Sequence, residues 1–146
     1  MKAGPIQRYR RLSSEQRRLL SRSVMLLTAA SAAVALLPFR RALAIGSVAI
    51  CKHGDAVDPF DCVWAVEAAA RRLPWRTMCI EKGLAVQRML RQSGVDARLH
   101  YGARHHPLTK VLQAHVWVTV DGRAVIGGEE AKDFALVATY PELHRG

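Results

Sequence analysis

Apolar and polar residues alternate most clearly over residues 112–120, and this alternation predicts a β-strand. One face of the strand would carry Ala114, Val116, Val118 and Val120, and the other face His115, Trp117 and Thr119. The Asp121-Gly122 dipeptide after the strand is typical of a two-residue hairpin turn. We therefore expect a return strand over residues 123–126, with His115 opposite Gly128 if the pairing continued without interruption.

A second pattern, with helical spacing, extends from Cys79 to Gln92. Its apolar side consists of Cys79, Ile80, Gly83, Leu84, Val86 and Leu90, whereas Glu81, Lys82, Arg88 and Gln92 lie on the opposite side. Thr77 is a candidate N-cap, and Ser93-Gly94 is a typical helix end. Gly83 on the apolar side indicates that another backbone approaches closely, and Gln87 near its centre requires a hydrogen-bond partner.

Weaker patterns cover the rest of the chain after residue 54. Residues 62–72 form a helical pattern that Asp58 or Asp61 can cap, residues 95–101 alternate like a strand, and residues 104–110 are a polar loop. Residues 134–138 fit either a strand or a short helix. Helices followed by an antiparallel hairpin predict an α+β fold.

The positive charge is concentrated in the first part of the chain. Residues 1–41 contain nine Lys/Arg and one acidic residue, giving 9 − 1 = +8, whereas residues 42–146 contain thirteen and eleven, giving 13 − 11 = +2. A nucleic-acid-binding domain would carry its basic face on the folded part, so we expect no nucleic acid. We divide the chain into a basic and apolar helical N-terminal arm (residues 1–54) and a domain (residues 55–146).

The arm permits three interpretations. Ser13 to Gln16 has the pattern of a capping box, and an apolar run comes after it over residues 24–37. The run is short for a membrane-spanning helix, so residues 8–41 would form a helix on a membrane surface or a partner, or one packed on the domain's own core. A cleaved signal is the third interpretation, but Arg40 and Arg41 stand where a cleavage region is normally uncharged.

Cys79 is the strongest candidate for chemistry because it opens a predicted helix, and His115 lies later in the chain on a predicted strand. A thiolate is the reactive form of cysteine, a helix N-terminus favours it, and an imidazole can take its proton. This is the layout of papain-like and transglutaminase-like nucleophiles. The alternative is that Cys79 is a core residue and His115 a structural histidine.

The other chemistry-bearing residues suggest no cofactor. Cys51 and Cys62 complete an odd count of three cysteines, which is no disulfide framework, and Cys62 fits a buried apolar position. His100, His105 and His106 lie near one another but have no acid or thiol at ligand spacing, so we expect no metal.

A group that orients His115 is harder to find. Asp121 lies six residues away, about 20 Å along an extended strand. Glu130 would share the face of His115 if the return strand continued past the glycines, and Glu129 would do so if they formed a bulge.

Taken together, three segments resemble the leader-peptidase family of lasso-peptide biosynthesis, the B protein, which is a transglutaminase-like cysteine protease. These segments are Thr77-Met-Cys-Ile-Glu-Lys-Gly-Leu-Ala-Val-Gln-Arg-Met-Leu90, residues 94–102, and Ala114-His-Val-Trp-Val118 with Asp121-Gly122. The resemblance implies a transglutaminase/papain-like core, with Cys79 as the nucleophile and His115 as the general base. The acid of that family lies at about Gly127, where this chain has Ile126-Gly127-Gly128.

The resemblance also implies a function and partners. We expect a cytoplasmic peptidase, with membrane contact if the arm lies on a membrane, that removes the leader from a ribosomally made precursor peptide. A separate leader-binding protein and an ATP-using macrolactam cyclase would be its partners. The backbone N–H of Cys79 would help stabilise the oxyanion, with Gln87 or Gln113 assisting. The alternatives are a transglutaminase-like enzyme that modifies amides, and a scaffold, or impaired enzyme, that recruits the maturation machinery.

Overall fold

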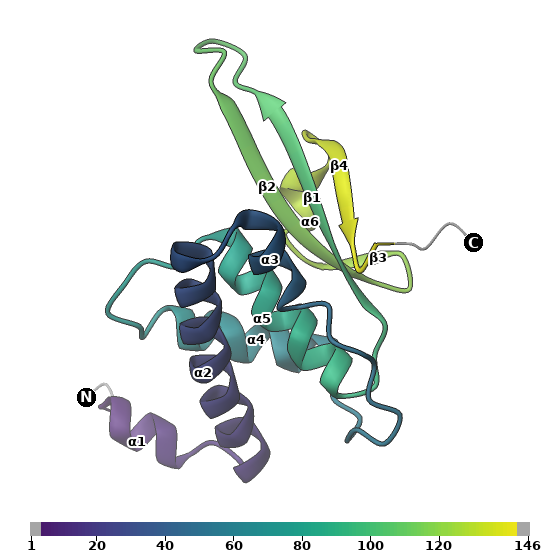
Figure 1. Cartoon of the computed structure of the whole chain (residues 1–146). Helices are drawn as coiled ribbons and strands as arrows, with labels where there is room; N and C mark the ends of the chain where they lie inside the picture. Colours follow the sequence, from purple (N-terminus) through teal and green to yellow (C-terminus); the bar gives the residue numbers. More distant parts are fainter. Residues whose placement is uncertain (1–3, 143–146) are drawn as a thin grey trace.

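The computed structural model describes residues 4–142, which form a layer of helices below one antiparallel sheet (Figure 1). The helices are α1 (Pro5–Arg10), α2 (Ser14–Leu36), α3 (Phe39–Ala44), α4 (Pro59–Ala70), α5 (Cys79–Gln92) and α6 (Gly128–Ala131). The strands are β1 (Ala97–His105), β2 (Leu112–Val120), β3 (Arg123–Ile126) and β4 (Ala135–Tyr140). This mixture of 47% helix and 20% strand confirms the α+β class.

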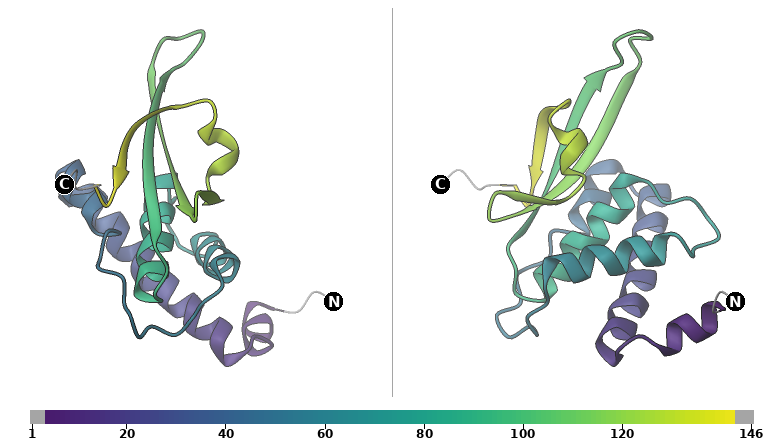
Figure 2. Two further views of the ribbon diagram at one scale, coloured as in Figure 1. Left: turned by 90° about the vertical axis from the view of Figure 1, so that its right-hand side faces the viewer. Right: turned by 180° about the vertical axis from the view of Figure 1, so that it is seen from behind.

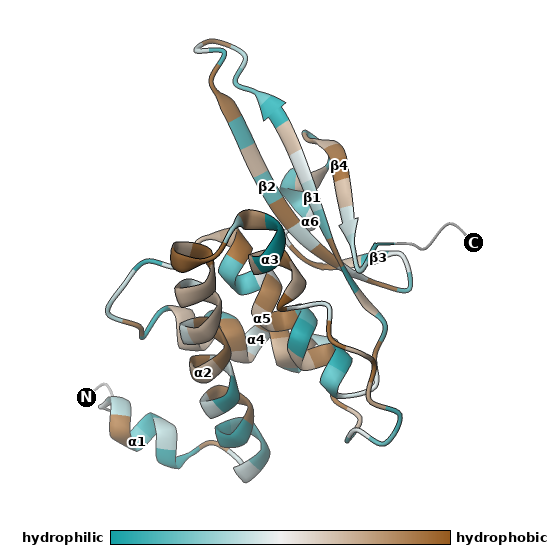
Figure 3. Ribbon diagram, in the orientation of Figure 1, coloured by the Kyte–Doolittle hydropathy of each residue, from teal (hydrophilic) through white to brown (hydrophobic). Residues whose placement is uncertain are grey.

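The three long helices α2, α4 and α5 pack against one another and form most of the core (Figures 1 and 3). Leu27 of α2, Val66 of α4 and Leu84 of α5 are fully buried there. Burial of apolar side chains is the main favourable contribution to folding, at about 25 cal/mol per Å² of apolar surface. Helix α2 begins with the predicted capping box, since the Ser13 hydroxyl accepts from the Gln16 N–H at 3.1 Å and the Gln16 side chain accepts from the Ser13 N–H at 3.0 Å.

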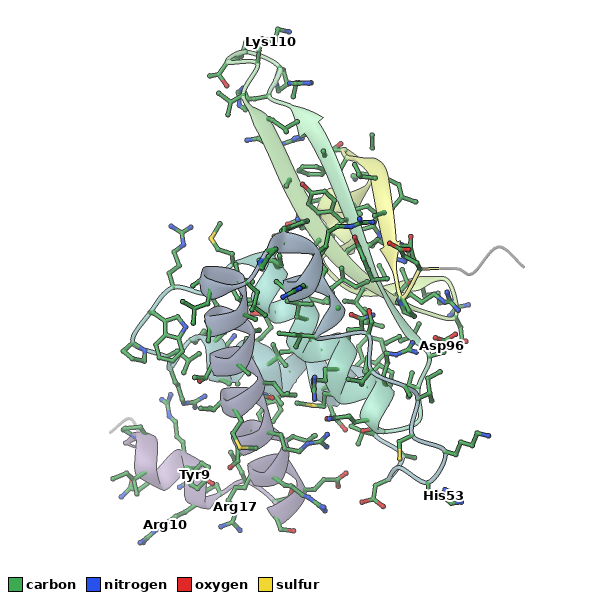
Figure 4. All side chains as sticks on the ribbon, viewed as in Figure 1. Tyr9, Arg10, Arg17, His53, Asp96 and Lys110 are labelled. Atoms are coloured by element: carbon green, nitrogen blue, oxygen red, sulfur yellow. The ribbon has the colours of Figure 1, made fainter. Side chains whose placement is uncertain are left out.

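Helix α2 is longer than the predicted apolar run, and it packs on the body of the protein. It begins at Ser14 and by length and composition alone could cross a membrane, although a core helix passes the same test. A third of its most apolar stretch is buried against the rest of the chain, whereas Met25 and Leu36 are exposed. Arg10 and Arg17 lie at the end of the helical layer far from the sheet (Figure 4). The division of the chain at residue 54 stays a prediction.

The sheet has the strand order β3-β2-β1-β4, and its β1–β2 hairpin extends away from the helices, with Lys110 near the tip (Figure 4). Strand β2 has the predicted bounds. Strand β1 is longer than predicted, because Arg104 and His105 continue the pairing with Gln113 and Leu112. The polar loop predicted over residues 104–110 is therefore shorter.

Helix α5 packs on the face of the sheet that carries Val116, Val118 and Leu99. Gly83 permits this contact, because a Cβ there would lie 2.8 Å from Cγ1 of Val116. The prediction that another backbone approaches Gly83 is wrong, because the close neighbours are side chains of the sheet.

The predicted pairing of His115 with Gly128 is wrong. Val120 pairs with Arg123 as expected, but the register shifts between Val118 and Thr119, so that Val118 pairs with Ile126. Such a β-bulge places one extra residue on one strand and bends the strand beyond it. Strand β3 ends at Ile126, and the chain turns into α6.

The segment after α6 then crosses the hairpin to the other edge of the sheet (Figure 2). A Cβ at Gly102 of β1 would lie 2.8 Å from the Trp117 ring, 2.9 Å from Phe134 and 3.1 Å from the Ala135 carbonyl oxygen, which shows how closely the segment packs. Residues 135–140 form strand β4 beside β1, which decides between the two interpretations of the tail in favour of a strand.

Candidate active site

Cys79 is the first residue of α5, as predicted, but the cap of this helix differs from the prediction. Met78 is the N-cap, and its N–H donates to the Glu81 carboxylate at 2.8 Å. The interpretation of Thr77 as the cap is therefore wrong. Glu81 was also placed on the exposed side of the helix, whereas its side chain folds back to the helix start and the residue is only 8% exposed. The helix start is thereby fixed at Cys79.

His115 lies on β2 with its ring held from one side. Its Nε2 is 2.7 Å from the carbonyl oxygen of Gly127. A carbonyl can only accept, so Nε2 carries the proton, and in the neutral ring Nδ1 is then the unprotonated nitrogen. Among residues 4–142, no side chain or backbone group forms a hydrogen bond with Nδ1. This nitrogen is the one that can take a proton from a thiol.

Two cavities meet at Cys79, His115 and Glu130, which line both of them. The larger, of about 390 Å³, extends along Arg76 to Met78 and toward β1, and the smaller, of about 230 Å³, extends toward α4 and β3. The structure therefore brings together the predicted nucleophile, the predicted base and one of the two candidate acids. A further cavity of about 490 Å³ beside the start of α2 has no cysteine or histidine in its lining, so volume alone does not identify the site.

Glu130 lies close to His115, but not because a strand continues past the glycines. Its Oε2 is 3.8 Å from Nε2 of His115, and its side chain is 65% exposed. No strand continues directly past the glycines, since Gly127 is the N-cap of the short helix α6, and this helix places Glu130 at the site. Glu129 lines neither of the two cavities at Cys79 and faces a depression formed with β3 instead.

The two glutamines proposed as oxyanion donors lie elsewhere. Gln87 is fully buried, and its Nε2 donates to the carbonyl oxygens of Tyr140 at 2.9 Å and Ala97 at 3.4 Å. These hydrogen bonds to the sheet explain why a polar residue stands at this buried position of the helix. The Gln113 side chain accepts from Nε of Arg104 at 2.9 Å, and neither glutamine lines a cavity at Cys79. The first N–H groups of α5, where Cys79 lies, have no intrahelical acceptor and remain the candidate donors.

Arg104 and Phe134 are part of the site but were missed in the sequence. The guanidinium of Arg104 lies 4.6 Å from the centre of the Phe134 ring and 3.9 Å from the carboxylate of Asp133. The Phe134 ring in turn lies 5.2 Å from the ring of His115. Extending the predicted strand over residues 95–101 by three residues would have placed Arg104 on a strand, but no local signal links residue 134 to this face.

Comparison with protein families matches residues 24–139 to the Transglutaminase-like superfamily. The chain belongs to this superfamily. The match covers most of the sequence and begins within α2, so the region shared with the superfamily includes much of the N-terminal arm. No curated protein matches the chain, and no solved structure does.

Members of the transglutaminase-like superfamily are generally thiol-dependent peptidases or acyltransferases, and this agrees with a cysteine and a histidine at one cavity. The cysteine at the start of a helix and the histidine on an antiparallel sheet were predicted as the core of such a domain, and this fold prediction is confirmed. The catalytic roles of Cys79, His115 and Glu130 stay predictions.

Within residues 4–142, the remaining cysteines and histidines line neither of the two cavities. Cys62 is fully buried in α4, and burial raises the pKa of its thiol to about 12. Both ring nitrogens of His100 are bonded to threonine hydroxyls, at 2.9 and 2.8 Å. His105 and His106 form hydrogen bonds within the hairpin turn. These contacts give the residues structural roles.

Proposed function

We propose that this protein is a cysteine peptidase that removes the leader from a ribosomally synthesised precursor peptide during lasso-peptide maturation. The observation that carries the proposal is the meeting of Cys79, at the start of α5, with His115 and Glu130 at two adjoining cavities. Residues 77–102 and 114–122 resemble the leader-peptidase family, and this resemblance supports a precursor peptide as the substrate.

The geometry supports a two-stage reaction through a thioester. Nδ1 of His115 takes the proton of the Cys79 thiol, and the sulfur attacks the carbonyl carbon at the junction of leader and core. The oxyanion is stabilised by N–H groups at the start of α5. His115 then gives its proton to the departing amine of the core, which leaves the leader as a thioester on Cys79. Water attacks this thioester, His115 takes a proton from the water, and the thiol is restored as the leader carboxylate departs.

The two cavities suit a peptide substrate, because they extend from Cys79 in different directions. The larger cavity is lined by Arg76 and Arg104 as well as by Asp133, and Met78 beside it is 54% exposed. A peptide crossing Cys79 would place residues on each side of the scissile bond in contact with the protein. Such contacts position the carbonyl for attack.

The partners of the proposed reaction are taken from the resemblance to the leader-peptidase family. Helix α2 is packed on α4 and α5. We propose that a leader-binding protein presents the precursor and that an ATP-using macrolactam cyclase closes the ring after cleavage. Contact of residues 8–41 with a cytoplasmic membrane surface stays a prediction, as does the cytoplasmic location.

The test is a cleavage assay read by mass spectrometry. The protein is mixed with the precursor peptide and the leader-binding protein, in parallel with Cys79→Ala and with Cys51→Ala, which removes an exposed thiol away from the cavities. Separate leader and core masses are expected with the wild type and Cys51→Ala and not with Cys79→Ala. Cleavage that survives Cys79→Ala would overturn the mechanism.

The same assay separates the alternatives. Acyl transfer to an amine, the other chemistry of the superfamily, would join two masses and leave no free leader carboxylate. An unchanged precursor in every tube, with the leader-binding protein shown to bind, would favour the scaffold function.

A further inference from the structure

We propose that the backbone carbonyl of Gly127 is the group that orients the His115 imidazole, in the place where the related peptidases are expected to use an acidic side chain. The inference rests on the proposed function, since it concerns the base of that reaction. Gly127 acts through His115 and is therefore a positioning residue. The chain would then be a complete enzyme in spite of the glycine at the acid position.

The distances favour the carbonyl over the nearby carboxylate. The Gly127 oxygen is 2.7 Å from Nε2 of His115, which is a short hydrogen bond. The Glu130 carboxylate, at 3.8 Å from the same nitrogen, is outside hydrogen-bond distance, and its side chain is mostly in solvent. Only one proton is present on Nε2, and the carbonyl is the acceptor within reach.

The backbone at Gly127 explains why this position carries no side chain. Its φ of +74° lies in the left-handed region, which glycine adopts without steric cost. A Cβ would lie 2.7 Å from the Val116 carbonyl oxygen and 3.2 Å from Nε2 of His115. An aspartate cannot occupy this position in the present conformation. The same left-handed turn directs the Gly127 carbonyl oxygen toward Nε2 of His115.

The charges around His115 are mostly paired with one another. Arg104 lies 3.9 Å from Asp133, and Lys82 lies 3.1 Å from Glu67. Glu130 and Arg76 are the other charged residues in the two cavity linings. A neutral carbonyl fixes the tautomer and the ring orientation, whereas the exposed Glu130 adds a charge that solvent screens. Orientation and charge are thus supplied by different groups.

The first experiment reads the tautomer directly. Two-bond ¹H–¹⁵N spectra of the histidine rings are recorded for the wild type and for Glu130→Ala. We expect His115 to have its proton on Nε2 in both proteins, because the carbonyl is unaffected by the substitution. A proton on Nδ1 in the wild type, or loss of the Nε2-protonated form in Glu130→Ala, would overturn the proposal and make the carboxylate the orienting group.

The second experiment changes the position of the Gly127 carbonyl group by substitution. Gly127→Ala is compared with Gly122→Ala, because Gly122 has nearly the same left-handed φ, +76°, and open space around it. Alkylation of Cys79 by iodoacetamide is measured from pH 5 to 9, with the exposed Cys51 as the reference. We expect Gly127→Ala to lower the alkylation rate of Cys79 at neutral pH by at least about tenfold, since the general base is no longer aligned. The alkylation of Cys79 should then depend on pH in the same way as that of Cys51.

Gly122→Ala should leave the Cys79 profile unchanged, since it tests backbone strain alone. An equal effect of the two substitutions, or no effect of Gly127→Ala, would contradict the proposal. If circular dichroism shows that Gly127→Ala does not fold, the tautomer spectra of the wild type and Glu130→Ala decide. Neither experiment uses a peptide, so failure of leader cleavage and failure of this inference are observed separately.

Discussion

Cys79 and His115 line the same two cavities, whereas Cys62 and His100 lie on different elements outside both cavities. Cys62 is buried in the helical core on α4, and the half-buried His100 on β1 is held between the hydroxyls of Thr119 and Thr139. At the two cavities, Cys79 is half-buried, and His115 is held through one nitrogen only. The two histidines lie on the same sheet and both stack on Trp117, with ring centres 5.5 and 6.1 Å from its ring.

The difference between Cys79 and Cys62, and between His115 and His100, lies in their surroundings and not in residue type. Burial outweighs the nearby charge of Arg22, which acts in the opposite direction, and raises the pKa of the Cys62 thiol to about 12, so this thiol stays protonated at neutral pH. Cys79 begins a helix, where N–H groups point outward, and it is open to a cavity. His100 has no ring nitrogen left for chemistry, whereas His115 keeps Nδ1.

The largest expected effect is the difference between replacing Cys79 and replacing Cys62. Cys79→Ala should lower leader cleavage by at least about 10³-fold, because the nucleophile is lost. Cys62→Ala should keep the wild-type rate and lose only packing, which costs about 1 kcal/mol of unfolding free energy. Mass spectrometry measures the cleavage rates of the two variants, and urea unfolding measures their stability. Equal loss of cleavage in the two variants would show that the site does not depend on Cys79 specifically.

Replacing each histidine should separate activity from stability. His115→Ala should lower cleavage by about 10²- to 10⁴-fold with little change in unfolding, because it removes the general base. His100→Gln should keep cleavage within a few-fold but lose about 1 kcal/mol of stability, since two threonine hydroxyls lose a half-buried hydrogen-bond partner. If His115→Ala and His100→Gln lost activity and stability in the same proportion, the two histidines would not have different roles.

The Glu130 carboxylate should have a smaller effect. Glu130→Gln keeps the size of the side chain and removes its charge, which lies 3.8 Å from His115 and is largely exposed. We expect cleavage to fall by no more than about fivefold, the size of a screened surface charge, and the difference to shrink in about 0.5 M salt. A loss of about 10²-fold or more, measured at low and high salt, would make Glu130 the main orienting group.

The unfolding free energy should depend on pH through His100. Burial, followed by the nearby charge of Arg98, lowers the pKa of His100 from 6.5. The unfolded chain therefore binds more protons than the native one just below pH 6.5, so stability rises with pH in this range and falls as the pH drops below it. Urea unfolding at about pH 8 and pH 5.5 should show a larger fall for the wild type than for His100→Gln. Identical falls would assign the pH dependence to other groups.

The elements that position the site could be predicted where the pattern of side chains was strong. The bounds of α5 and β2 and the capping box at Ser13 follow from local spacing, and the structure confirms them. Cys79 and His115 come from these two elements, so their placement at one cavity was within reach of the sequence. The interior position of Cys62 was also predicted, because it lies in an apolar helical pattern.

The parts that could not be predicted depend on backbone atoms and on contacts distant in sequence. A β-bulge leaves no clear mark in the sequence, so the register beyond Val118 was wrong, and with it the expected neighbour of His115. The Gly127 carbonyl carries no side-chain signal at all. The position of Glu81 depends on a rotamer that returns its carboxylate to the helix start, and the partners of Gln87 and Gln113 come from segments distant in sequence or across a strand pair, so local spacing does not reveal them.

The most direct test of an activated nucleophile compares the three thiols in one sample. The native protein is treated with iodoacetamide at neutral pH, and the modification of Cys51, Cys62 and Cys79 is measured by peptide mass mapping. We expect Cys79 to react faster than the exposed Cys51, and Cys62 to react only after unfolding. A Cys79 that reacts no faster than Cys51, or not at all, would contradict an activated nucleophile at this site and favour a protein that recruits partners without catalysing a reaction.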